Sequence, residues 1–202
     1  MRLMNTSFLN TRAARRASML LSAAVALLAL PACGQRNVVL NVDVLSYLDA
    51  SETEFTFGPV PAFPGGISTG EQSVVPEADI NLVGNLADIA DIHTVSLRIA
   101  VASESYSGDG ADTLRFYLSE PGTDPRTTPV VMMVPLTLTA SVADTTVTEI
   151  TGDERVLGLF SSQAMKLAIT TSLRGPSNGD ALSGRVTITG IDATVIAGRK
   201  GL

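Results

Sequence analysis

The chain has 202 residues, of which 45% are apolar, 17% charged and 4% aromatic, and this composition predicts one globular domain with terminal segments. Its charge is unevenly distributed. Residues 1–32 hold four of the 14 basic side chains and no acid, so the rest carries ten basic and twenty acidic side chains. Such acidity excludes a nucleic-acid partner, because phosphate contacts need clustered Lys and Arg. The single Cys and single His exclude a disulfide framework and an ordinary Cys/His zinc site.

The first thirty residues have the pattern of an export signal. A basic stretch ends at Arg15 and Arg16, and an uncharged apolar run follows from Met19 to Leu30. This run is too short for a spanning helix, which needs about 20 apolar residues, but it suits the apolar region of a signal peptide. The residues after the arginine pair fit the twin-arginine pattern poorly, so we expect the general export route.

The segment Leu30-Pro31-Ala32-Cys33 resembles the lipobox of bacterial lipoproteins, with Pro31 a less usual occupant of the second position. The resemblance covers only about the first 34 residues. It implies cleavage between Ala32 and Cys33, a diacylglyceryl group on the Cys33 thiol, and acylation of the new amino terminus. Gly34, in place of an Asp, implies sorting to the outer membrane. The alternatives are a buried core thiol, or cleavage elsewhere that leaves Cys33 free.

We expect no other cofactor than these covalent lipid groups. More than one acyl chain gives stable anchoring where a single chain does not, and each buried methylene contributes roughly 0.8 kcal/mol. The expected organisation is a removed signal peptide (1–32), a lipidated anchor with a short tether (33–36), and one folded domain (37–202).

The folded domain shows the alternation of apolar and polar residues that is typical of half-buried strands. Most of the outward positions are occupied by Thr, Ser, Asn and Arg. This favours antiparallel sheets with one face exposed to solvent. The alternating segments are Leu40–Val44, Val95–Val101, Leu114–Leu118, Leu136–Thr139, Leu167–Leu173 and Val186–Thr189.

Two turn segments predict that neighbouring strands pair as hairpins. Gly and Asn-Gly supply the positive φ that tight turns need. The predicted pairs are 93–102 with 112–119 across residues 107–110, and 164–173 with 183–197 across residues 175–180.

Two residues predict irregularities. Ile188 and Ile191 are three apart, so a bulge at Gly190 is needed to place both on one face. Pro135 lies within the segment 129–142 and favours an edge strand or a break between two shorter strands.

Two short helices are expected. Thr151 and Glu154 match a capping box, and Val156, Leu157 and Phe160 follow at helical spacing. Residues 85–91 are the second candidate, with Asn85 as the cap.

Residues 51–77 are rich in Pro and Gly, and long excursions of this kind are usually functional or mobile. We interpret this segment as an ordered wrap with one edge strand at Glu54–Phe57. The whole pattern predicts an all-β, antiparallel β-sandwich of about eight strands, with jelly-roll or immunoglobulin-like topology.

We expect no catalytic residue. His93 is the only imidazole and stands at the start of a predicted strand, where a structural role is several times more common. Paired carboxylates could hydrolyse glycosides. The close acidic pairs and trios, however, are expected in so acidic a chain; they are Asp49 with Glu52 and Glu54, Asp88 with Asp91, and Asp153 with Glu154.

Three loop residues are weak binding candidates. Asp109 and Asp112 could supply oxygens to calcium, but their spacing does not match an EF-hand. A plain hairpin turn, which prefers Asp and Gly for backbone reasons alone, is the favoured explanation. Tyr106 is the best candidate for an exposed aromatic face that could bind sugar.

These observations predict a membrane-anchored envelope lipoprotein that acts as a non-enzymatic binding or structural module, with an envelope protein as a possible partner. Two alternatives remain. One is a calcium-dependent adhesion or carbohydrate-binding module, and the other is an envelope hydrolase that uses carboxylates.

Overall fold

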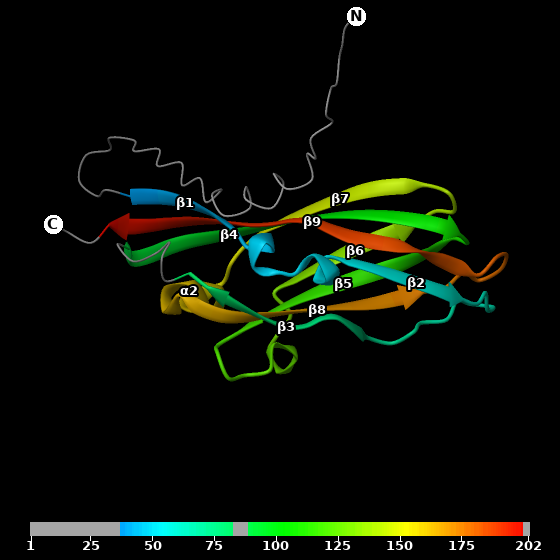
Figure 1. The fold of residues 1–202 in the computed structure, drawn as a ribbon, viewed down its shortest axis with the longest axis horizontal. Coiled ribbons are helices and arrows are strands. Elements are labelled where there is room, and N and C mark those ends of the chain that lie inside the picture. The colour runs from blue at the N-terminus through cyan, green and yellow to red at the C-terminus, as the bar shows by residue number, and fades with distance from the viewer. Residues whose placement is uncertain (1–36, 83–88, 200–202) are drawn as a thin grey trace, which may run out of the picture.

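The computed structural model describes residues 37–82 and 89–199 and arranges them in two antiparallel sheets stacked face to face (Figure 1). This confirms the predicted β-sandwich. One sheet contains β1 (Asn37–Asp43), β9 (Leu182–Arg199), β4 (Ile89–Ser107), β7 (Ala143–Thr151) and β2 (Glu54–Val60). The other contains β3 (Gln72–Asn81), β8 (Ala164–Arg174), β5 (Gly110–Ser119) and β6 (Met132–Leu138).

The strand pairing identifies the topology as a jelly roll. Strands β1 and β9, β3 and β8, β4 and β7, and β5 and β6 pair as the two sides of one long antiparallel ribbon. Pairing of β9 with β4 and of β8 with β5 then rolls this ribbon into two sheets. Eight strands wrapped in this way are the double-sheet jelly roll, which decides between the two predicted topologies. Strand β2 is additional and pairs with the first half of β9.

The apolar residues of alternating strands meet between the sheets, as the sequence pattern requires. In β6 every second residue from Met132 to Leu138 is buried. In β9 the register against β4 shifts so that Ala100 faces Gly190 while Val101 faces Ile188. This bulge places Ile188 and Ile191 on the inner face, and both are buried. The bulge predicted at Gly190 is therefore confirmed.

The predicted edge strands are also found. Pro135 lies in β6, which has β5 as its neighbour at one end of the sheet, and the strand continues unbroken through the proline. A proline on a free edge leaves no ladder hydrogen bond unmade. The Pro/Gly-rich excursion contains β2, an edge strand that runs to Val60, and it enters β3 at Gln72.

The two predicted hairpins are wrong. Strands β4 and β5 belong to different sheets, as do β8 and β9, so each intervening turn carries the chain across the sandwich. Gly108 and Gly179 do have positive φ values of 70° and 83°. Turn chemistry alone does not say whether the next strand pairs with the last, because the choice of sheet depends on long-range partners.

One predicted helix is confirmed with a different cap. Helix α2 (Glu154–Ser162) buries Val156, Leu159 and Phe160 at the end of the sandwich. Its N-cap is Asp153, whose Oδ1 accepts a hydrogen bond of 2.9 Å from the Val156 amide, so the predicted capping box is wrong. Asp is at least as good an N-cap as Thr, and residue 151 is still part of β7.

The second predicted helix, residues 85–91, is wrong for its last three residues, because strand β4 begins at Ile89. Residues 85–88 lie outside the described residues. Three short 3-10 helices complete the described elements: η1 (Leu45–Tyr47), η2 (Ala50–Glu52) and η3 (Pro125–Thr127). None of the helices in the described ranges is both long and apolar enough to cross a membrane.

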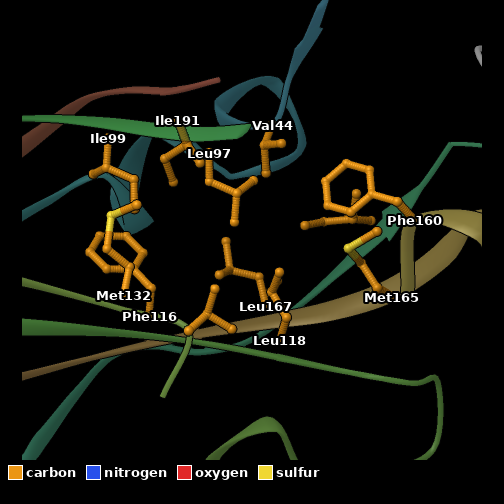
Figure 2. A pocket seen from close by; sticks show the side chains of 12 residues that line it. Val44, Leu97, Ile99, Phe116, Leu118, Met132, Phe160, Met165, Leu167 and Ile191 are labelled. Carbon is orange, nitrogen blue, oxygen red and sulfur yellow. The ribbon is translucent and has the colours of Figure 1, made fainter. Parts of the chain in front are cut away.

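A small gap lies in the core beside α2. Figure 2 shows side chains of both sheets, including Leu97 and Leu167, and the ring of Phe160 around it. Its volume is about 20 Å³, comparable with one water molecule, and its lining is entirely apolar, so we expect it to be dry.

Candidate functional site

An open hollow of about 350 Å³ lies at one end of the sandwich, which we call the loop tip. There the β2–β3, β4–β5 and β8–β9 connections meet. The side chains around the hollow that can contact a ligand are those of Asp109, Ala111, Arg174, Ser177 and Asn178.

Backbone hydrogen bonds hold the β2–β3 connection against the end of β8. The Thr69 amide donates to the Leu173 carbonyl (3.0 Å), and the Gly175 amide donates to the Ile67 carbonyl (2.8 Å). The Arg174 guanidinium adds a bond from Nη2 to the Gly65 carbonyl (2.9 Å). The rim of the hollow is therefore fixed by the main chain.

Glycine at position 110 keeps the floor of the hollow close-packed. A Cβ at this position would lie 2.6 Å from the Arg174 carbonyl oxygen and 2.7 Å from a methyl group of Leu182. Only a residue without a side chain allows β5 to begin this close to the end of β8.

The two calcium candidates have different environments. Asp109 is exposed at the hollow, and its Oδ1 accepts a 2.8 Å hydrogen bond from the Ala140 amide, which ties down the β6–β7 connection. Asp112 is buried, with 1% of its surface exposed. Within residues 37–82 and 89–199, no three His, Cys, Asp or Glu side chains approach closely enough to hold a metal ion.

Asp112 is a buried carboxylate beneath the loop tip. Its Oδ1 accepts hydrogen bonds from the Thr171 hydroxyl (2.6 Å), the Thr113 amide (2.6 Å) and the Ser172 amide (3.2 Å). Its Oδ2 is buried without a partner among the described residues. Burial raises the pKa of this carboxyl above its ordinary value, and the three hydrogen bonds offset part of that effect.

This raised pKa predicts a pH dependence of stability. As the pH rises above the ordinary value of 3.8, the unfolded chain loses the proton of Asp112 before the folded chain does. The free energy of unfolding should therefore fall as the pH rises through this window. Urea unfolding at several pH values should show that Asp112→Asn removes this component. Identical pH profiles for the two proteins would contradict the prediction.

Tyr106 is exposed, as predicted, with 52% of its surface accessible. It does not line the hollow. It lies near Arg185, which forms ion pairs with Glu104 (3.0 Å) and Glu54 (3.7 Å). These groups form a polar patch on the outer face of the five-stranded sheet.

Most of the acidic residues singled out in the sequence have structural partners. Asp49 and Glu52 cap η2 reciprocally, with the Asp49 amide 2.8 Å from a Glu52 carboxylate oxygen. Asp153 caps α2 and Glu54 pairs with Arg185. His93 is exposed within β4.

The sequence did not single out a second polar cluster, at the start of β3. One oxygen of Glu71 accepts 2.6 Å hydrogen bonds from Tyr117 and Thr170, which lie on β5 and β8. The hydrogen bond from Thr170, and to a lesser extent that from Tyr117, lowers the pKa of Glu71. Burial and the hydrogen bond to the Glu71 carboxylate raise the pKa of Tyr117. The cluster fixes the point at which the β2–β3 connection joins the sheet. Nearby, the buried Nη1 of Arg115 has no partner among the described residues.

Cys33, the predicted lipidation site, and the Ala32–Cys33 cleavage site lie outside the described residues, as do Gly34 and Asp88. The lipid anchor therefore remains a prediction from the sequence.

Similarity to known proteins is confined to distant likenesses among solved structures. No family model matches the sequence, and no curated protein is significantly similar to it. Among solved structures, one of infectious bursal disease virus, Gx strain, matches with a TM-score of 0.41 and 15% identity over 84% of this chain and 37% of that chain. A structure described as "CBM4 structure and function" matches with a TM-score of 0.28 and 8% identity, over 80% of this chain and 87% of that chain.

A structure of broad bean stain virus matches with a TM-score of 0.29 and 12% identity, over 71% of this chain and 87% of that chain. The chain spans about two fifths of the length of the bursal disease virus proteins that it matches. We infer no function from these likenesses.

Proposed function

We propose that this protein is a lipid-anchored binding module of the bacterial envelope, and that its loop tip carries the binding surface. In this proposal Cys33 bears the lipid groups, Gly34 directs the protein to the outer membrane, and the protein acts without catalysis.

The short distance between the lipidation site and the first strand supports this arrangement. Cys33 precedes Asn37, the first residue of β1, by four positions. Four fully extended residues reach at most about 14 Å, so the lipid would hold this end of the sandwich close to the membrane.

The loop tip lies at the opposite end of the molecule. Asn37 pairs with Gly198 near the end of β9, whereas Val60, next to the tip, pairs with Leu182 at its beginning. The 18 residues of β9 span roughly 60 Å at the usual rise of a strand. Figure 1 shows the start of β1 on the left and the β8–β9 connection on the right. An anchor at Cys33 would thus leave the hollow facing away from the membrane.

The polar character of the hollow favours binding as its role. An exposed carboxylate, a guanidinium and side-chain hydroxyl and amide groups converge there, on a rim fixed by the main chain. The carboxylates of Asp49, Glu52 and Asp153, which could have suggested a hydrolase, are engaged in helix caps.

Metabolic labelling with radioactive palmitate tests the anchor. We expect the wild-type protein to incorporate label, and Cys33→Ala to abolish both label and membrane association, because the thiol is the acceptor of the lipid. Gly34→Ala, which leaves the cysteine in place, is the control and should keep the label. An unlabelled wild-type protein, or a labelled Cys33→Ala variant, would overturn the proposal.

A further inference from the structure

We infer that the hollow at the loop tip binds a short neutral saccharide. This inference rests on the proposed function, in which the loop tip is the binding surface, and it adds the chemical class of the ligand.

The charges around the hollow favour a neutral ligand. Asp109 and Arg174 contribute one negative and one positive side chain. A metal ion would be repelled by the guanidinium and would find only one carboxylate, and a phosphate would be repelled by Asp109. A ligand without net charge faces neither penalty, and it can still accept from Arg174 and donate to Asp109.

The hydrogen-bonding groups of the hollow match the hydroxyls of a sugar. Asp109 uses Oδ1 for the Ala140 amide, and its exposed carboxylate can accept further bonds. Asn178 supplies a donor and an acceptor, and Ser177 supplies a hydroxyl; both residues are exposed. Each sugar hydroxyl is both donor and acceptor, so neighbouring hydroxyls can pair with a carboxylate and an amide or guanidinium side by side.

An exposed aromatic residue is bonded through its backbone to two residues that line the hollow. Phe63 has 58% of its surface accessible, although its position is fixed: its amide donates to the Pro176 carbonyl (3.0 Å), and its carbonyl accepts from the Gly66 amide (2.7 Å). Pro176 and Gly66 both line the hollow. Phe63 is not one of the residues that line the hollow. We therefore expect its ring to pack against the apolar face of a sugar only where a saccharide extends beyond the hollow.

The dimensions agree with this ligand class. A volume of about 350 Å³ lies at the lower end of the range for small-molecule sites. The hollow is open rather than enclosed, so a saccharide chain could extend beyond it.

Calorimetric titration of the full-length protein in detergent tests the inference directly. The probes are neutral trisaccharides of glucose, mannose, galactose and N-acetylglucosamine, with a uronic-acid trisaccharide as the acidic comparison. We expect a neutral probe to bind more tightly than the acidic one. Asp109→Asn and Arg174→Ala should each weaken binding about tenfold or more, since each removes a charge-assisted hydrogen bond.

Two of the variants, one of them additional, separate binding from folding. Asp109→Asn keeps an acceptor for the Ala140 amide, and Ala111→Phe fills the hollow while leaving every polar group in place. The matched controls are Arg98→Ala and Asp192→Ala, an exposed ion pair on β4 and β9 away from the tip, and both should bind as the wild type does. Binding that survives Ala111→Phe, or that falls equally in the controls, would overturn the inference.

A second assay distinguishes this inference from the proposed function. Protein binding to isolated envelopes is measured after treatment with periodate, which oxidatively cleaves the carbon–carbon bond between neighbouring sugar hydroxyls, and after treatment with protease. Loss with periodate supports a saccharide. If binding is lost only after protease treatment, and Ala111→Phe still abolishes binding to untreated envelopes, the ligand is a protein. That result overturns the saccharide and leaves the tip as a protein-binding surface. An absence of binding to untreated envelopes overturns both.

Discussion

Phe160→Ala is expected to lower the free energy of unfolding by about 3–5 kcal/mol, the usual cost of removing a fully buried phenylalanine ring. Phe160 has 1% of its surface exposed and anchors α2 against both sheets. Its ring borders the existing gap in Figure 2, so the substitution enlarges a cavity that has little freedom to close. Chemical denaturation of both proteins at neutral pH gives the difference.

Ser161→Ala on the same helix is the control. Ser161 is exposed and its hydroxyl donates to the Leu157 carbonyl of the same helix (2.8 Å), so the change should stay within about 0.5 kcal/mol. A Phe160→Ala variant as stable as Ser161→Ala would show that α2 is not part of the core.

Gly184→Ala is expected to cost about 2–3 kcal/mol, because β9 passes too close to its neighbours there to admit a side chain. The added Cβ would collide with the Glu104 carbonyl oxygen and lie 2.7 Å from Cζ of Phe57. These atoms belong to β4 and β2, which flank β9 on its two sides. A shift of either strand would loosen the sheet below the loop tip.

The same strand offers a matched control. At Gly190 the nearest atoms to an added Cβ are 3.6 Å away, an ordinary van der Waals contact. Gly190→Ala should therefore change the free energy of unfolding by less than about 1 kcal/mol. Equal losses for the two alanine variants would refute the steric explanation.

The sequence predicted those strands whose inner and outer faces differ. The bulge at Gly190 could even be placed from the sequence. The two-residue period of a strand puts Ile188 on the inner face but Ile191 on the outer face, so one extra residue is needed between them to bury both. The edge position of Pro135 follows equally directly from its missing amide hydrogen.

Strands β3 and β7 were missed because their patterns do not alternate. In β3 the register shifts between Ser73 and Val75 and again between Val75 and Ala78, so the buried residues Val75 and Ala78 stand three apart. In β7 the two large apolar residues, Val147 and Ile150, face opposite sides, and Val147 is half exposed. A strand at an edge with little burial on either face leaves no periodic signal.

The candidate site was only partly predictable. Asp109 was identified as a loop residue and weak calcium candidate, and the structure places it, exposed, at the hollow. Asp112 was paired with it because the two are close in the chain, but strand alternation turns Asp112 into the core. Arg174 ends β8, and Ser177 and Asn178 follow it in the β8–β9 connection; the rolled topology brings these residues beside Asp109. Sequence spacing cannot show such a meeting.

The central claim is that Cys33 tethers this jelly roll to a membrane, and the mass of the amino-terminal peptide of protein purified from membranes tests it most directly. The account predicts a chain that begins at Cys33 and carries the mass of a diacylglyceryl group and an amide-linked acyl group. An unmodified Cys33 in a chain that retains residues 1–32 would contradict it.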